Sequence, residues 1–177
     1  MKSASDLVNF RLDTDQFQIF KISSKDGLTI DKLSTLVQFE QTVPDICYLQ
    51  VGSNDVGKIS KDRIVDSIIA FAEYLLFGVG IRRVIIGQLL RRDPKLVKYN
   101  EMVIAVNVKL EEKVKTKNEN IVFWKHRGFW KDYSHLGRDG VHLKNPKHKG
   151  KLGSSSPMHK YWRSIRNSLI LHSKTLM

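Results

Sequence analysis

The stretch Ile46-Cys47-Tyr48-Leu49-Gln50-Val51-Gly52-Ser53-Asn54-Asp55 decides the fold. A short, mainly apolar run lies between Pro44 and Gly52, and an asparagine and an aspartate follow the glycine. An apolar run of this length, bounded by proline and glycine, predicts a buried β-strand. In open α/β sheets, ligands bind beyond the carboxyl ends of the strands. The polar residues after this strand therefore predict a functional loop.

Strands and helices are expected to alternate along the rest of the chain. Hydrophobic patterning predicts further strands over residues 17–22, 83–90 and 120–125. Helices are predicted over 31–39 behind Thr29, from Ser60 to about Phe77, from Pro94 onward, and from Ser156-Pro157. Strands that are each followed by a helix predict a mostly parallel sheet covered on both faces. The expected fold is a three-layer α/β/α sandwich.

The chain of 177 residues is long enough for one domain. We expect an α/β domain over residues 1–143, a basic loop over 144–156, and a C-terminal helix over 157–177 that packs on the same domain. The net charge is +12, and residues 144–177 hold eight Lys or Arg residues but no Asp or Glu. The segment between Lys144 and Arg166 could bind nucleic acid or an acidic partner, or it could be a solvated tail.

The composition argues against several other classes of protein. No apolar run is long enough to span a membrane, and the N-terminus lacks the apolar core of a signal peptide. The single cysteine, Cys47, lies in an apolar run, which predicts a buried thiol and an intracellular, cytoplasmic protein. We found neither paired metal-ligand spacing nor a nucleotide-binding loop, so neither a metal nor a cofactor is expected.

Asp139-Gly140-Val141-His142 is the second candidate functional motif. A histidine can act as a general base near neutral pH, and an aspartate can hold its imidazole in the productive tautomer. Asp132-Tyr133-Ser134-His135 has the same spacing and is an alternative pair. The polar neighbours of the remaining histidines predict surface positions for His126, His148, His159 and His172.

In this order, the motifs resemble the SGNH hydrolase superfamily, also called GDSL-like esterases and lipases. The matching pieces are Lys25-Asp26-Gly27-Leu28-Thr29, Leu49–Asp55 and Asp139-Gly140-Val141-His142-Leu143. The likeness runs from about Phe17 to Leu143. It is greatest to esterase-like domains of animal genomes, some of them derived from retroelements. The resemblance implies a flavodoxin-like SGNH fold and the hydrolysis of a small carboxylic or acetyl ester.

The resemblance also assigns roles to individual residues. His142 would be the general base and Asp139 its orienting partner. Asn54 would donate its side-chain amide to the oxyanion, and Gly27 its backbone N–H. Gly52 would allow a tight turn, while Asp55 would shape the loop by hydrogen bonds.

The nucleophilic serine that the family carries after its first strand is not visible in this sequence. Ser3, Ser5, Ser23, Ser24 and Ser53 are candidates, but none of them lies in a Gly-Asp-Ser-like block. We therefore expect a member truncated before or within that block, without the central strand and catalytically impaired or inactive. The nucleophile is unknown.

Two features near the expected site allow two interpretations each. Arg91-Arg92-Asp93 follows the strand predicted over residues 83–90 and could bind an acidic substrate group or form a solvated helix entry. Trp130 could line a substrate pocket or pack its own loop. Trp124 and Trp162 are predicted to belong to the core.

Overall fold

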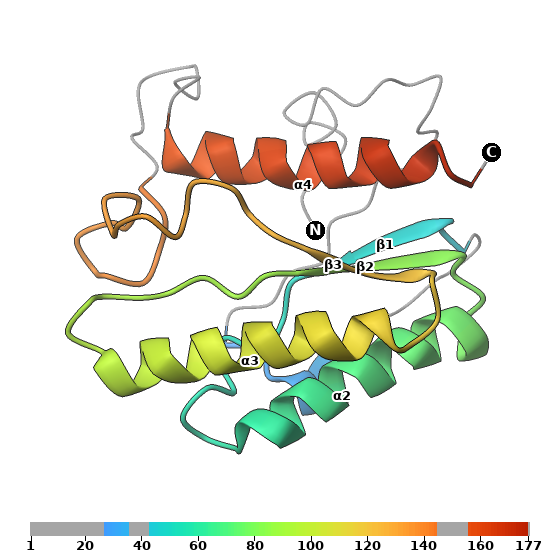
Figure 1. Ribbon diagram of the computed structural model, residues 1–177, viewed down its shortest axis with the longest axis horizontal. Coiled ribbons are helices and arrows are strands. Elements are labelled where there is room, and N and C mark those ends of the chain that lie inside the picture. Colours follow the sequence, from blue (N-terminus) through green and yellow to red (C-terminus); the bar gives the residue numbers. More distant parts are fainter. Residues whose placement is uncertain (1–26, 36–42, 145–155, 177) are drawn as a thin grey trace.

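The computed structural model describes residues 27–35, 43–144 and 156–176, drawn in colour in Figure 1. Its elements follow in the order η1 (Ile30–Thr35), β1 (Ile46–Leu49), α2 (Lys61–Glu73), η2 (Tyr74–Gly78), β2 (Arg83–Gly87), α3 (Val97–Lys115), β3 (Ile121–Trp124) and α4 (Pro157–Ser173). The strand predicted over 17–22 and four serine candidates, Ser3, Ser5, Ser23 and Ser24, lie outside the described residues.

The three described strands form a parallel sheet in the order β1-β2-β3. Ile46 pairs with Arg83 at the start of β1, and Val84 pairs with Ile121 at the start of β3. Helices α2 and α3 cover one face of this sheet and α4 covers the other (Figure 1). The predicted three-layer α/β/α architecture is confirmed.

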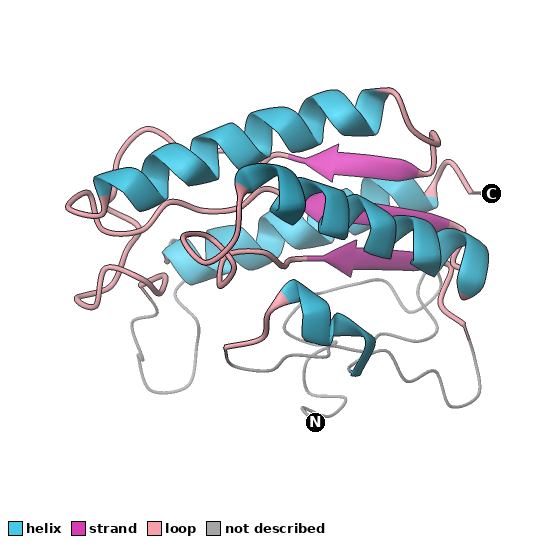
Figure 2. Ribbon diagram, turned by 90° about the horizontal axis from the view of Figure 1, so that it is seen from below, coloured by secondary structure: helices cyan, strands magenta, loops and turns pink. Residues whose placement is uncertain are grey.

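The parallel arrangement brings the loops after the strands to one edge of the sheet. All three arrows point the same way in Figure 2, and the loops that follow them gather on the left side of that view. We refer to this side as the carboxyl edge.

Two of the predicted helix starts are confirmed by their capping hydrogen bonds. Ser60 Oγ accepts the backbone N–H of Arg63 at 3.2 Å, and Ser156 Oγ accepts that of His159 at 3.1 Å. The helix predicted from Pro94 begins three residues later than expected, at Val97. The helix predicted over 31–39 is a 3₁₀ helix, Ile30–Thr35, within the described residues.

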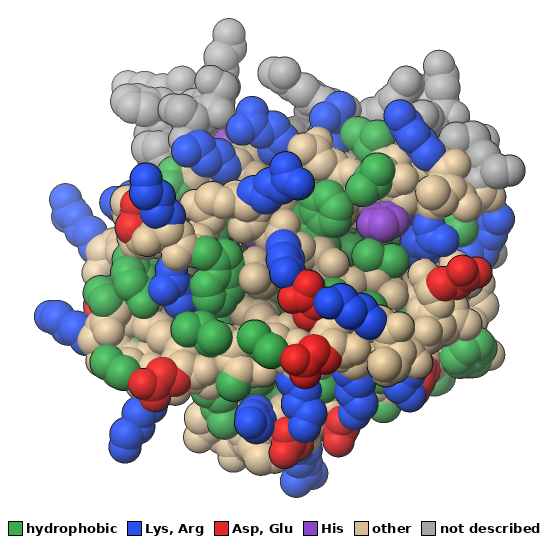
Figure 3. All heavy atoms as spheres, viewed as in Figure 1, with side chains coloured by type: hydrophobic (Ala, Val, Ile, Leu, Met, Phe, Trp, Pro, Cys, Tyr) green, Lys and Arg blue, Asp and Glu red, His purple; other side chains and the backbone are tan. Residues whose placement is uncertain are grey.

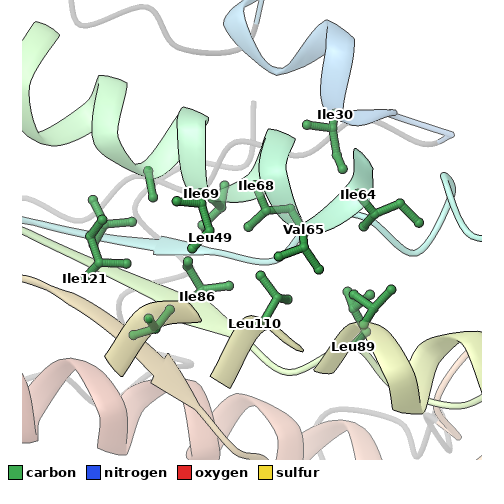
Figure 4. Close-up of a cluster of buried hydrophobic side chains, with 14 of the residues drawn as sticks. Ile30, Leu49, Ile64, Val65, Ile68, Ile69, Ile86, Leu89, Leu110 and Ile121 are labelled. Carbon is green, nitrogen blue, oxygen red and sulfur yellow. The ribbon is translucent and has the colours of Figure 1, made fainter. Parts of the chain in front are cut away.

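The main core lies between the sheet and helices α2 and α3 (Figure 4). Ile64 and Ile68 of α2 and Leu110 of α3 are fully buried there, together with Val84 and Ile86 of β2. Because side chains alternate along a strand, Ile85 faces α4 and packs against Ile165 and Leu169. Strand β2 is thus buried on both faces, as its continuous apolar sequence requires.

The single cysteine and two of the tryptophans pack at the borders of these clusters. Cys47 is half-buried against the main core, and burial raises the pKa of its thiol to about 11. Trp124 and Trp162 are half-buried against the smaller cluster that Ile85 forms with Ile165 and Leu169 of α4. These positions agree with the structural roles predicted for them.

Candidate active site at the carboxyl edge

The loop after β1 begins with a turn that a glycine makes possible. Gly52 has φ of +102°, and a Cβ atom at this position would lie 3.1 Å from Ile68 Cδ1. The next turn is closed by the N–H of Asp55, which donates to the Gly52 carbonyl at 3.0 Å. The Asp55 carboxylate is buried and accepts the backbone N–H of Ile30 at 3.2 Å, and burial raises its pKa. Asp55 therefore ties η1 to this loop.

The amide of Asn54 is held at both ends. Its Nδ2 donates to the Leu28 carbonyl at 2.9 Å, and its Oδ1 accepts from Arg92 Nη2 at 3.4 Å. An amide nitrogen carries two protons, so one N–H remains for a ligand. Gly27 directly precedes Leu28 and has φ of +68°. The chain segment that carries Gly27 thus lies against Asn54.

Two buried asparagines of α3 shape the loop after β2. Asn107 accepts the N–H of Leu89 and donates to its carbonyl, both at 2.9 Å. About two turns nearer the helix start, Asn100 accepts the N–H of Arg92 at 2.9 Å and donates to the carbonyl of Asp93 at 3.0 Å. These bonds satisfy the backbone of an irregular segment that leaves the sheet.

Arg92 connects this loop to the loop after β1. Its guanidinium lies 4.5 Å from the centre of the Tyr99 ring, and its Nη2 is 3.3 Å from the Ser53 carbonyl. Tyr99 donates its hydroxyl to the same carbonyl at 3.1 Å. Arg92 and Tyr99 together fix the backbone next to Asn54.

Arg91 and Asp93 connect the same segment to the loop after β3. The Arg91 guanidinium lies 4.9 Å from the Trp130 ring and 4.6 Å from the Tyr133 ring, and it donates to the Trp130 carbonyl. Asp93 donates its N–H to the Gly140 carbonyl at 2.7 Å. Of the two interpretations of Trp130, the structure favours loop packing, because its ring faces Arg91.

Asp139 and His142 form a hydrogen-bonded pair on this loop. Asp139 Oδ2 lies 2.7 Å from His142 Nδ1, and Asp139 Oδ1 accepts the backbone N–H groups of Val141 at 2.9 Å and His142 at 3.0 Å. The N–H of Val141 and the His142 side chain hold the pKa of Asp139 well below its usual range. The ionised carboxylate only accepts, so Nδ1 carries the proton. In a neutral ring Nε2 is then the nitrogen without a proton, and the His142 side chain is 81% exposed.

The alternative pair, Asp132 and His135, has a different geometry. His135 is buried, and neither of its ring nitrogens has a hydrogen-bond partner among the described residues. Burial lowers the pKa of His135, which favours the neutral ring. Asp132 instead accepts the backbone N–H of Ser134 at 2.8 Å. This geometry favours Asp139 and His142 as the candidate base pair, although their catalytic roles stay predictions.

The surface position predicted for His126 is wrong. His126 is 1% exposed, and it lies between the Tyr48 hydroxyl, 2.9 Å from Nε2, and the Ser164 hydroxyl, 3.0 Å from Nδ1. Its backbone N–H donates to Gln88 Oε1 at 3.1 Å. Its position two residues after β3, where the carboxyl edge meets α4, could have indicated burial. The polar residues that flank it in the sequence led instead to the prediction of a surface position.

The described residues do not supply an identifiable nucleophile. Among the residues that the structure describes, no hydroxyl is hydrogen-bonded to His142. Ser53, the described candidate, contributes its carbonyl to Arg92 and Tyr99.

The described ranges also bring together no group of three metal-ligating side chains, and none of their helices is long and apolar enough to cross a membrane.

Comparisons with known proteins agree with this architecture. No protein-family model and no curated protein sequence matches the chain. Among solved structures, a carbohydrate esterase family 3 protein from Talaromyces cellulolyticus is similar with a TM-score of 0.64 at 20% identity, over 84% of this chain and 70% of that one. An acetyl esterase in which a serine is replaced by alanine, solved with an acetate ion, is similar with a TM-score of 0.62 at 17% identity, over 85% and 70%. The chain has the fold of the SGNH hydrolases.

Proposed function

We propose that this chain is an esterase-type domain that binds the acyl group of a small carboxylic or acetyl ester at the carboxyl edge. The observation that carries the proposal is the Asp139–His142 pair, joined at 2.7 Å and tied through Asp93 and Arg92 to the loop of Asn54. The fold similarity to two esterases supports it. That acetyl esterase was solved with an acetate ion, which is the acid part of an acetyl ester.

The residues present would provide two of the functions that ester hydrolysis needs. The remaining N–H of Asn54 and the backbone N–H of Gly27 would bind the carbonyl oxygen as it becomes negatively charged. His142 Nε2 would take the proton of an attacking hydroxyl and return it to the leaving alcohol. We propose that the 177-residue chain alone binds such esters without hydrolysing them, because no serine of a Gly-Asp-Ser-like block is present in it.

The expected result is that the chain shows no His142-dependent hydrolysis of p-nitrophenyl acetate. Loss of the serine of a triad costs on the order of 10⁶ in rate, about as much as loss of the whole triad. Wild-type protein and the His142→Ala variant should therefore hydrolyse the ester at the same background rate. His135→Ala provides a control for any histidine-dependent background. Hydrolysis that disappears in His142→Ala but persists in His135→Ala would show that one of the chain's own serines is active.

A second candidate function uses the basic C-terminal segment to bind nucleic acid. Lys160 and Arg163 are exposed on α4, and this helix carries no Asp or Glu. In Figure 3, blue side chains gather over α4 without red ones among them, whereas the two colours are mixed over α2 and α3. Such a surface could contact phosphate groups.

Single-stranded RNA binding is expected to weaken as salt is raised, because phosphate contacts release counterions. Each phosphate contact with a single strand contributes about 0.7 to the slope of log K against log salt. The double variant Lys160→Gln/Arg163→Gln removes two cations, so it should make this slope shallower by about twice that amount. The matched control, Lys109→Gln/Lys113→Gln, removes two lysines of α3 that pair with Asp62 and Asp66. Absence of RNA binding at low salt would exclude this candidate.

A further inference from the structure

Arg91 and Arg92 are two half-buried cations beside the candidate site. No Asp or Glu among the described residues forms an ion pair with either of them. Both guanidinium groups lie against aromatic rings that shield one of their faces from water. A partly desolvated cation gains most from an anionic partner. Neither guanidinium is therefore paired directly with a carboxylate of the described chain.

The two arginines differ in what they contact. Arg91 binds the carbonyl of Trp130 and the hydroxyl of Tyr133, so it holds the loop after β3.

Arg92 reaches toward the predicted oxyanion donor, with its Nη2 3.4 Å from Asn54 Oδ1. The partners of the Arg92 side chain that the structure shows are all neutral: the backbone carbonyl of Ser53, the amide oxygen of Asn54 and the ring of Tyr99. Arg92 is therefore the cation that a ligand bound at Asn54 would meet.

We propose that Arg92 makes the site selective for ligands that carry a carboxylate group. This inference rests on the proposed function, because it assumes that ligands bind at Asn54 and His142. A carboxylate has two oxygens, and the guanidinium offers planar N–H donors that match them. The group could be the acid product of an ester, such as acetate, or a charged substituent on the ester. Arg92 thereby determines specificity, while His142 and Asn54 contact the reacting atoms.

Two esters of the same acid isolate the effect of the carboxylate. Dimethyl succinate is neutral, whereas monomethyl succinate has one ester and one carboxylate. NMR titration of the wild-type chain, followed at the His142 ring and the Asn54 side-chain amide, should show about tenfold tighter binding of the monoester. In Arg92→Gln the ratio of the two affinities should fall to about one. Arg92→Lys should keep part of the preference for the monoester, because lysine retains the positive charge but not the planar donors.

Two control variants separate charge from loop positioning. Arg82→Gln makes the same change of charge at an exposed residue before β2, where Arg82 pairs with Asp45 at 3.4 Å, so it should keep the tenfold ratio. Tyr99→Phe keeps the ring but loses the hydroxyl bond to Ser53. It should weaken both esters together and leave their ratio unchanged. If Arg92→Gln does not fold, two other measurements replace it. These are the affinity ratio of the two succinates in Arg92→Lys and the decrease of the wild-type ratio at high salt, where charges are screened.

Each outcome of the titration has one meaning. A preference for the monoester that depends on Arg92 supports recognition of a charged substituent. Binding of acetate that depends on Arg92, without preference between the two succinates, supports recognition of the acid product. Equal binding of both succinates together with acetate binding unchanged in Arg92→Gln overturns the inference but leaves the proposed function intact. If no ligand shifts His142 or Asn54, the proposed function fails and the inference fails with it.

Discussion

Replacing Asn107 with leucine is expected to lower the free energy of unfolding by about 3 kcal/mol, because two buried backbone groups lose their partners at once. Asn107 is 5% exposed, and its amide binds both the N–H and the carbonyl of Leu89. Each buried polar group left unpaired costs about 1–3 kcal/mol. Leucine has a similar volume, so the change removes the hydrogen bonds without creating a large cavity.

Urea unfolding at pH 7 measures this loss as a lower midpoint with an unchanged slope. The matched control is Asn167→Leu, which places the same substitution at an exposed position of α4. Its effect on the free energy of unfolding should stay within about 0.5 kcal/mol. Equal losses in the two variants would show that the Leu89 backbone does not depend on Asn107. The NMR signals of Arg91 and Arg92 should also shift in Asn107→Leu, because the same loop carries them.

The architecture was predictable because its strands are apolar runs with clear boundaries. The run that ends at Gly52 and the run that contains Val84-Ile85-Ile86 both became parallel strands. The caps Ser60 and Ser156 were predictable because capping depends on neighbouring residues alone. The start of α3 was misplaced because Asp93 binds the N–H of Lys95 and turns the chain before the helix begins.

The candidate site was partly predictable for the same reason. The contact between Asp139 and His142 spans three residues, so the motif itself shows it.

The contacts of Asn100 and Asn107 with the loop after β2 could not be read from the helical pattern, because both asparagines lie on the face of apolar residues. The bonds by which Arg91, Arg92 and Asp93 reach the loops after β1 and β3 join residues about 40 positions apart or more. Nothing in the local sequence specifies such partners.

Buried His126 is expected to make the chain sensitive to mild acid. Burial lowers the pKa of His126 from 6.5 to about 4, because the charged ring would lose its hydration between Tyr48 and Ser164. The unfolded chain therefore takes up a proton near pH 6.5, whereas the folded chain does so only near pH 4. The stability that the neutral ring contributes is complete above the unfolded pKa. It is lost as the pH falls from 6.5 toward 4 and amounts to about 3 kcal/mol.

The loss should begin at α4, because His126 joins the sheet to this helix through Ser164. Trp124 donates its indole N–H to the same Ser164 hydroxyl at 3.0 Å, so the fluorescence of Trp124 can report the separation of α4 from the sheet. In His126→Gln, a side chain that does not titrate can still bind Tyr48 or Ser164. Its stability should therefore change less between pH 7 and pH 4.5 than that of the wild type.

His159→Gln, on α4 but without these contacts, is the control and should keep the acid sensitivity that His126 supplies. Urea midpoints at the two pH values measure both variants. If His126→Gln and the wild type lose the same stability in acid, His126 is not the group that couples α4 to pH.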